Sequence, residues 1–201
     1  MIQSEGRITL LCLAFLVLCA FGFTQFLAFH ELSSQESGIV VNDPLFHWLP
    51  LFDNSIFIFS ITYGSILLYA FMNYRSTGFA ARAILSYAFV LLLRIPTLSL
   101  VSLKVHPDLI YLEDPFLNDL IYPSRITNDL FFSGHVALLC NFAQLSRYKL
   151  VFVVLTVILA LLLLIQRVHY SIDVLGAIPF SFLAVRLSDL LLHKIGLKRI
   201  D

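Results

Sequence analysis

The sequence predicts an all-α, polytopic membrane protein with six transmembrane helices. Two observations carry this prediction, namely the composition and the spacing of the apolar runs. Of the 201 residues, 59% are hydrophobic and 13% are charged, and the mean hydropathy is +0.90. Soluble domains have about 45–50% apolar and about 25% charged residues. A chain of this composition has too few polar side chains to cover a water-exposed surface, so we expect an integral membrane protein.

The apolar runs set the number of expected spans. A hydrocarbon core about 30 Å thick is crossed by roughly 20 apolar residues in a helix. Six segments approach that length: 8–29, 54–74, 79–101, 129–146, 149–166 and 170–192. The first follows Arg7, as a signal peptide would, but it has no A-x-A-like cleavage site, so we expect it to stay as a span. No repeat or linker divides the chain, so residues 1–201 are expected to form one membrane domain.

The basic residues predict the orientation of the spans, because cytoplasmic loops carry the excess of Lys and Arg. The side that holds the N-terminus, the second and fourth loops and the C-terminus has Arg7, Arg75, Arg82, Arg147, Lys149, Lys194, Lys198 and Arg199. The opposite side has Lys104, Arg125 and Arg167. Both termini are therefore expected in the cytoplasm. The two long loops, 30–53 and 102–128, then face the periplasm or an organelle lumen.

Charge and cysteine content exclude several classes of function. The formal net charge is zero, so nothing favours binding to nucleic acid. Cys12, Cys19 and Cys140 all fall in apolar runs, without the spacing of a disulfide framework or a zinc site. We interpret them as small hydrophobic side chains in the helices.

Four chemically capable side chains converge on one end of the expected bundle. His135 lies near the start of the fourth span, and His169 and Asp173 lie at the start of the sixth. Arg94 lies two-thirds of the way along the third span, which ends on the same side. Ionisable residues in membrane helices are costly and commonly functional. The sequence therefore predicts a polar site at the non-cytoplasmic face.

His169 and Asp173 are four residues apart in the segment RVHYSID, which places them on one face of a helix. A carboxylate that accepts the proton of one imidazole nitrogen fixes the tautomer and leaves the other nitrogen as a base or nucleophile. The same spacing also suits a structural pair that closes a helix end. The spacing alone favours neither interpretation.

The segment SGH offers an anion site at the start of the fourth span. Gly134 leaves backbone amides open, Ser133 adds a hydroxyl, and the N-terminus of a helix attracts negative charge. A lone histidine in a membrane helix is more often a buried hydrogen-bonding residue than a catalyst. The position of His135 at a helix start, on the same face as His169 and Asp173, favours the catalytic role. Arg94 would hold a phosphate, or it would serve the structure by reaching the interface or pairing with Asp129.

Together, Arg94, DLFFSGH and HYSID resemble motifs of the type 2 phosphatidic acid phosphatase superfamily. The closer likeness is to its sphingomyelin synthase-like branch, in which DxLFSGH and HYxxD recur and an arginine in the third helix precedes a Thr/Pro stretch. The resemblance covers roughly residues 80–190. It implies a six-helix fold of that kind, His135, His169 and Asp173 as catalytic residues, and Arg94, Ser133 and Gly134 as ligands of the phosphate. Asp129 and Arg167 are two further candidates.

The chain departs from the first and third phosphatase motifs. In the first, Tyr87 stands where the motif has a lysine, and Ile95 separates Arg94 from Pro96, which are adjacent in the motif. In the third, Leu162 and Leu163 stand where the motif has Ser-Arg. These losses remove basic ligands of a phosphomonoester and favour a phosphodiester. The resemblance does not extend to the cytoplasmic N-terminal domain of the sphingomyelin synthases. The identity of their substrate therefore does not carry over to this chain.

The resemblance thus implies a lipid phosphotransferase that acts through a phosphohistidine and needs no metal or other cofactor. Its partners would be a phospholipid donor and a lipid hydroxyl acceptor such as ceramide or diacylglycerol, within the bilayer. The alternative uses water as the acceptor, which makes a lipid phosphatase or a phospholipase C-like hydrolase. A non-enzymatic transporter or scaffold is the third interpretation, although transporter sites usually lie at the midplane between repeated halves.

Overall fold

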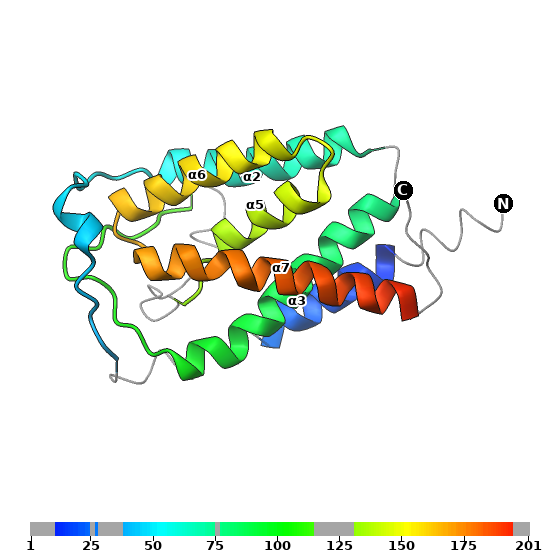
Figure 1. The fold of residues 1–201 in the computed structure, drawn as a ribbon, viewed down its shortest axis with the longest axis horizontal. Helices are drawn as coiled ribbons and strands as arrows, with labels where there is room; N and C mark the ends of the chain where they lie inside the picture. The colour runs from blue at the N-terminus through cyan, green and yellow to red at the C-terminus, as the bar shows by residue number, and fades with distance from the viewer. Residues whose placement is uncertain (1–10, 25–26, 28–37, 75–76, 115–130, 195–201) are drawn as a thin grey trace.

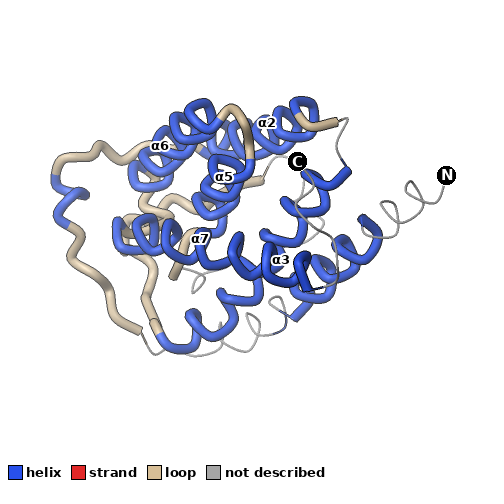
Figure 2. The backbone as a smooth tube through the Cα atoms, turned by 45° about the vertical axis from the view of Figure 1, so that its right-hand side comes forward, coloured by secondary structure: helices blue, strands red, loops and turns tan. Residues whose placement is uncertain are grey.

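The computed structural model describes residues 11–24, 27, 38–74, 77–114 and 131–194. All the regular secondary structure in these ranges is helical (Figures 1 and 2). The elements are an N-terminal helix, a 3-10 helix η1 and the helices α2, α3, α5, α6 and α7, with the bounds Leu11–Thr24, Pro44–His47, Ser55–Met72, Thr77–Leu100, Gly134–Leu145, Lys149–Ile165 and Ser171–Lys194. The all-α membrane fold expected from the sequence agrees with this arrangement.

Three helices are long and apolar enough to cross a bilayer, namely Ser55–Met72, Gly78–Leu98 and Ser171–Lys194. The helices Leu11–Thr24 and Lys149–Ile165 are apolar but shorter. Each of the six expected segments contains a helix, yet only three of these helices reach the length of a full span among the described residues. The chain is a membrane protein by this criterion.

The fourth expected span differs most from its prediction. It was expected over residues 129–146, but α5 begins at Gly134 and has 12 residues. At 1.5 Å per residue this helix is only about 18 Å long. Most of its side chains are buried against α2, α3, α6 and α7, so it has little surface to offer to lipid. It is a central helix enclosed by protein.

Aromatic rings fill the core between α2, α5 and α6. The rings of Tyr69 and Phe142 stack with centroids 4.4 Å apart, and Phe152 meets them at 5.9 and 5.6 Å. On the other side of α5, α3 and α7 pack against each other. There Arg82 binds Asp189 through two hydrogen bonds of 2.5 and 2.6 Å.

The described parts of the two long loops lie together at one end of the bundle, beside η1, the end of α6 and the start of α7 (Figures 1 and 2). Ile39 donates a hydrogen bond to the carbonyl of Ser102 at 3.1 Å, and Lys104 donates to the carbonyl of Ile39 at 3.0 Å. The prediction that both loops share one side is consistent with this pairing. The α5–α6 turn lies at the opposite end.

Gln166 fastens the loops to this end. Its buried side chain accepts a hydrogen bond from the amide of Asn54 at 2.8 Å and donates to the hydroxyl of Ser55 at 2.8 Å. It also donates to the carbonyls of Ile110 and Tyr111. One amide side chain therefore joins the end of α6, the start of α2 and the loop that follows α3.

Candidate active site

His169 and Asp173 form a buried pair, as their spacing predicted. Nδ1 of His169 lies 3.5 Å from Oδ2 of Asp173, and both side chains are almost fully buried. His169 lies in the bend before α7 and not on the helix itself, which begins at Ser171. Because Asp173 faces Nδ1, the other imidazole nitrogen, Nε2, is directed away from the carboxylate. At this distance the pair makes no hydrogen bond, and Nδ1 is a buried atom without a hydrogen-bond partner among the described residues. A small movement that closes this gap would give the carboxylate–imidazole pair of a triad, in which Nε2 is left for chemistry.

Asp173 also fixes the backbone on which His169 sits. Its Oδ2 accepts a hydrogen bond from the amide of Tyr170 at 2.9 Å. The next amide, that of Ser171, donates to Oδ2 of Asp43 at 2.5 Å. Two protein carboxylates thus bind consecutive amides at the start of α7. These two amides are therefore occupied by the protein and are not available to a substrate anion.

The start of α5 is held directly against the start of α7. The amide of Ser133 donates to the carbonyl of Asp173 at 3.1 Å, and the hydroxyl of Ser133 accepts from the amide of Val136 at 3.4 Å. Ser133 is therefore the N-cap of α5. The hydroxyl keeps its own proton for donation to a ligand.

Aromatic packing explains why α5 starts at this place. The ring of Phe132 stacks on that of Phe180 of α7, with centroids 4.4 Å apart. Phe131 lies over Gly176, where a Cβ would come within 3.0 Å of its ring. The two phenylalanines of DLFFSGH thus anchor the SGH segment on α7.

Arg94 reaches the N-terminus of α5 from α3. A Cβ added to Gly134 would lie 2.7 Å from Nη1 of Arg94 and 3.8 Å from the hydroxyl of Tyr87. The guanidinium therefore occupies space that only glycine leaves free. Arg94 is 6% exposed, so its positive charge is buried beside the first turn of α5. A guanidinium beside a helix N-terminus is a strong arrangement for binding a phosphoryl group.

His135 also belongs to the cluster. Its imidazole is partly buried, and the ring of Phe59 meets it edge-on with centroids 6.0 Å apart. His169, Arg94 and Asp114 all interact electrostatically with it. The structure thus brings together His135, His169, Asp173, Arg94, Ser133 and Gly134 from three helices and one bend.

Asp114 and Tyr63 complete the surroundings of His135, and neither is predicted from the sequence. The hydroxyl of Tyr63 on α2 donates to Oδ2 of Asp114 at 2.6 Å, and Asp114 is buried. Asp114 stands among several acids of the loop after α3, and no spacing distinguishes it from the others. Only the folding of this loop onto α2 places its charge near His135.

The two remaining candidates are not part of this cluster. Asp129 lies outside the described residues. Arg167 forms an ion pair with Asp108 and lies over the ring of Phe46, at 5.5 Å from its centroid. It belongs to a neighbouring polar pocket on the same end of the molecule.

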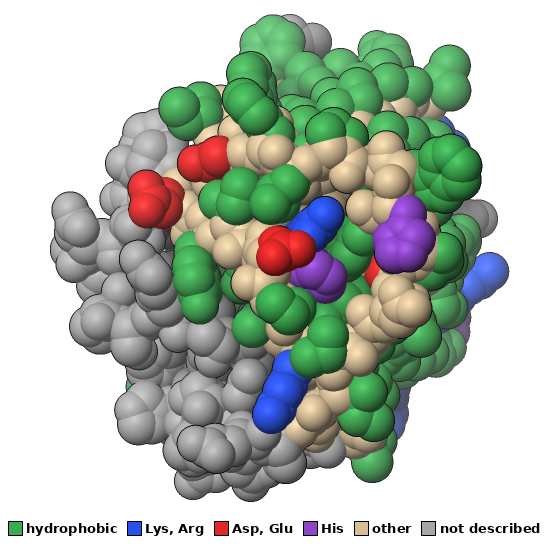
Figure 3. All heavy atoms as spheres, turned by 90° about the vertical axis from the view of Figure 1, so that its left-hand side faces the viewer, with side chains coloured by type: hydrophobic (Ala, Val, Ile, Leu, Met, Phe, Trp, Pro, Cys, Tyr) green, Lys and Arg blue, Asp and Glu red, His purple; other side chains and the backbone are tan. Residues whose placement is uncertain are grey.

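That end of the molecule is polar, whereas its flanks are apolar. Figure 3 looks onto it and shows histidine, acidic and basic side chains gathered among loop backbone, with hydrophobic side chains around them. Within the described ranges, no group of three or more His, Cys, Asp or Glu side chains could hold a metal ion. The side chains that the cluster itself offers are imidazoles, a carboxylate, a hydroxyl and a guanidinium.

No family model matches the chain, and neither a curated protein nor a solved structure matches it. A functional assignment therefore depends on the residues and their geometry.

Proposed function

We propose that this protein is a membrane phosphotransferase that moves the headgroup of a phospholipid to a lipid hydroxyl through a phosphohistidine. The observation that carries the proposal is the cluster at the start of α5. There the buried guanidinium of Arg94 lies against Gly134, next to His135 and the His169–Asp173 pair. A phosphoryl group held by Arg94 and the first amides of α5 would lie between two imidazoles. The motif resemblance to the sphingomyelin synthase-like branch supports the same assignment.

The first half-reaction transfers the headgroup phosphoryl to the enzyme. Nε2 of His169 attacks phosphorus, and the bond from phosphorus to the lipid alkoxide breaks. His135 gives its proton to the departing alkoxide. Asp173 stabilises the positive charge that develops on His169, in the way a triad carboxylate stabilises an imidazolium.

The second half-reaction regenerates the enzyme. The hydroxyl of ceramide, diacylglycerol or a similar lipid loses its proton to His135, and its oxygen attacks phosphorus. The P–N bond to His169 breaks, and its electron pair returns to the imidazole. Arg94 faces one phosphoryl charge throughout, which suits a phosphodiester. Tyr87, at the place of a phosphatase lysine, adds a hydroxyl beside Gly134 and no second cation.

Reconstitution tests the reaction. Purified protein in liposomes would receive labelled phosphatidylcholine, phosphatidylethanolamine or phosphatidylinositol, with and without ceramide or diacylglycerol. We expect a labelled headgroup on the acceptor lipid, which disappears with His169→Ala and persists with His193→Ala, an exposed histidine at the other end of α7. Release of a water-soluble headgroup phosphate alone would identify a hydrolase. No turnover of any lipid would overturn the proposal.

We also propose that the chain crosses the bilayer six times, in the type 2 phosphatidic acid phosphatase manner, with both termini cytoplasmic and the cluster on the periplasmic or lumenal face. The charge bias of the loops supports this topology. In a variant that lacks the native cysteines, Lys104→Cys should react with an impermeant maleimide from outside. Tyr74→Cys, which is exposed in the short second loop, should react only after permeabilisation. The opposite pattern would reverse the topology.

A further inference from the structure

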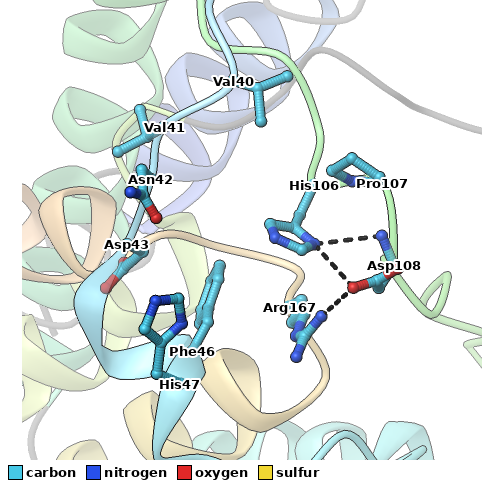
Figure 4. A pocket seen from close by; sticks show the side chains of 10 residues that line it. All are labelled: Val40, Val41, Asn42, Asp43, Phe46, His47, His106, Pro107, Asp108 and Arg167. Carbon is cyan, nitrogen blue, oxygen red and sulfur yellow. Dashed lines mark hydrogen bonds and ion pairs between the residues drawn. The ribbon is translucent and has the colours of Figure 1, made fainter.

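A polar pocket lies beside the candidate active site, between the two long loops and the turn before α7 (Figure 4). Its volume is about 380 Å³. Pockets that hold small ligands range from about 300 to 1,000 Å³, so this one suits a single ring-sized group. Its walls are Val40, Val41, Asn42, Asp43, Phe46, His47, His106, Pro107, Asp108 and Arg167.

The pocket shares backbone with the nucleophile site. Asp43 binds the amide of Ser171, while Asp173 binds the amide of Tyr170, one residue earlier. The ring of Phe46 at the base of the pocket lies 5.7 Å from that of Tyr170. Arg167 precedes His169 by two residues and has a φ of 56°, a backbone conformation that non-glycine residues seldom adopt. Strain of this kind concentrates at functional sites.

The charges that line the pocket are already compensated within the protein. Asp43 accepts one backbone amide on each oxygen, from Leu45 at 3.0 Å and from Ser171 at 2.5 Å. Asp108 forms an ion pair with Arg167. Nδ1 of His106 accepts a hydrogen bond from the amide of Asp108 at 3.1 Å, which requires an unprotonated Nδ1. The pocket therefore carries no uncompensated positive side chain.

This compensation argues against charged ligands. A phosphate would have to approach two carboxylates. A quaternary ammonium group prefers several aromatic faces, whereas here the ring of Phe46 is covered by Arg167. What the pocket offers is hydrogen bonding in both senses. Asn42 and His47 are exposed at its rim, and Arg167 and Asp108 keep further donors and acceptors.

We propose that this pocket binds an uncharged, hydroxyl-rich group, such as an inositol, a sugar or a glycerol, next to the reacting phosphorus. This inference rests on the proposed function for its first source, the headgroup of the phospholipid donor. A free polyol has the same hydroxyl chemistry and is the second source. The hydroxyls would bond to Asn42, His47 and Arg167, while Phe46 and Pro107 close the apolar side.

Two measurements test the pocket, and one of them does not depend on turnover. Saturation-transfer NMR on protein in nanodiscs should detect free myo-inositol and should not detect free choline. The signal should be lost in the double variant Asn42→Ala/His47→Ala and kept in Leu45→Ala, whose side chain lies on η1 but outside the pocket. Thermal unfolding of each variant verifies that it is folded. Absence of an inositol signal in the folded wild-type protein, together with equal turnover of all headgroups, would overturn the proposal.

The second measurement separates the two sources. With phosphatidylinositol and phosphatidylcholine at equal mole fraction, a lipid headgroup site predicts preferred turnover of phosphatidylinositol. The double variant should raise its KM about tenfold, as expected for the loss of one or two hydrogen bonds. Binding of free inositol without any lipid turnover would assign the pocket to a soluble polyol. That result would refute the proposed phosphotransferase activity but not the pocket. Preferred turnover of phosphatidylcholine, together with no inositol signal, would refute the pocket and leave the phosphotransferase standing.

Discussion

The guanidinium of Arg94 occupies the space that a side chain on Gly134 would need. A Cβ at that position would lie 2.7 Å from Nη1 of Arg94, closer than real contacts allow. A side chain at position 134 would therefore force the guanidinium of Arg94 to move away from the start of α5.

Gly134→Ala should displace the guanidinium and leave the bundle folded. A shift of about 1 Å in a positioning group can cost roughly 100-fold in rate, so we expect a loss of turnover of that order. Turnover in liposomes and thermal unfolding would be measured together. Gly64→Ala on α2 is the matched control, because a Cβ there meets nothing within 4 Å. Equal activity of the two variants would show that Arg94 does not need this space.

Arg94→Lys keeps the positive charge but loses the planar fork that binds two oxygens of one phosphoryl group. If Arg94 binds phosphate, this variant should fold normally and lose most of its turnover. Arg186→Lys, at an exposed position of α7, should remain fully active. Retention of near-wild-type turnover by Arg94→Lys would remove Arg94 from the phosphate site and return it to a structural role.

Alanine variants of the two histidines should lose different steps of the reaction. His169→Ala should abolish both turnover and any covalent phosphoryl-enzyme. His135→Ala should stop turnover of lipids, but a phosphodiester with a phenolate leaving group needs no proton and should still phosphorylate this variant. Acid-labile label trapped on each variant provides the measurement. Label on His169→Ala and none on His135→Ala would reverse the two roles.

Asp173→Asn retains the shape of the pair but presents the wrong hydrogen-bonding partner to Nδ1 of His169. The corresponding change in a serine protease triad costs about 10⁴ in rate. We expect a loss of several orders of magnitude in the rate of phosphoenzyme formation, measured by rapid quench. A loss in KM alone, with the chemical step unchanged, would contradict the orienting role.

Acid should loosen the loop that carries His106. Burial, and then the nearby Arg167, lower the pKa of His106 below its ordinary value of 6.5, while Asp108 and Asp43 oppose this effect. The folded state therefore binds fewer protons than the unfolded state, and its stability falls as the pH drops below about 6.5. Hydrogen exchange of residues 106–114 at pH 7.5 and 5 would measure this change, with Asp108, Arg167, Asp43 and His47 as the surrounding charges.

His106→Asn provides the comparison for that experiment. An asparagine can accept the same hydrogen bond from the amide two residues later but does not titrate in this range. The pH dependence of exchange in residues 106–114 should shrink in this variant. An unchanged dependence would contradict the assignment of the effect to His106.

The helices could be predicted from sequence because hydropathy acts over a whole segment. α2, α6 and α7 lie within two residues of the expected spans at each end. The start of α5 was predicted five residues too early, because Leu130, Phe131 and Phe132 are as apolar as the residues of a membrane-spanning helix. The cap by Ser133 and the packing of both phenylalanines on α7 decide the boundary instead.

The candidate site could be predicted in part. Ionisable side chains are energetically costly in apolar membrane segments and commonly have a function there. This rule is what makes His135, His169, Asp173 and Arg94 recognisable in the sequence. The sequence did not predict the roles of Asp43, Asp114 and Gln166, because each of them bonds to residues that are distant in the sequence. The amide of Asn54, for example, binds a side chain 112 residues away. No local pattern encodes such a contact.

One peptide unit joins the pocket to the segment that carries His169, the proposed nucleophile. In the planar peptide unit between Tyr170 and Ser171, the N–H of Ser171 donates a hydrogen bond to Asp43. The carbonyl of Tyr170 in the same unit accepts hydrogen bonds from the amides of Asp173 and Val174. Movement of Asp43 toward a ligand in the pocket would act on this plane, and through it on the first turn of α7, which carries Asp173. If it does, occupancy of the pocket and the position of the carboxylate beside His169 are coupled. By reciprocity, the phosphorylated enzyme should hold its polyol with a different affinity from the resting enzyme.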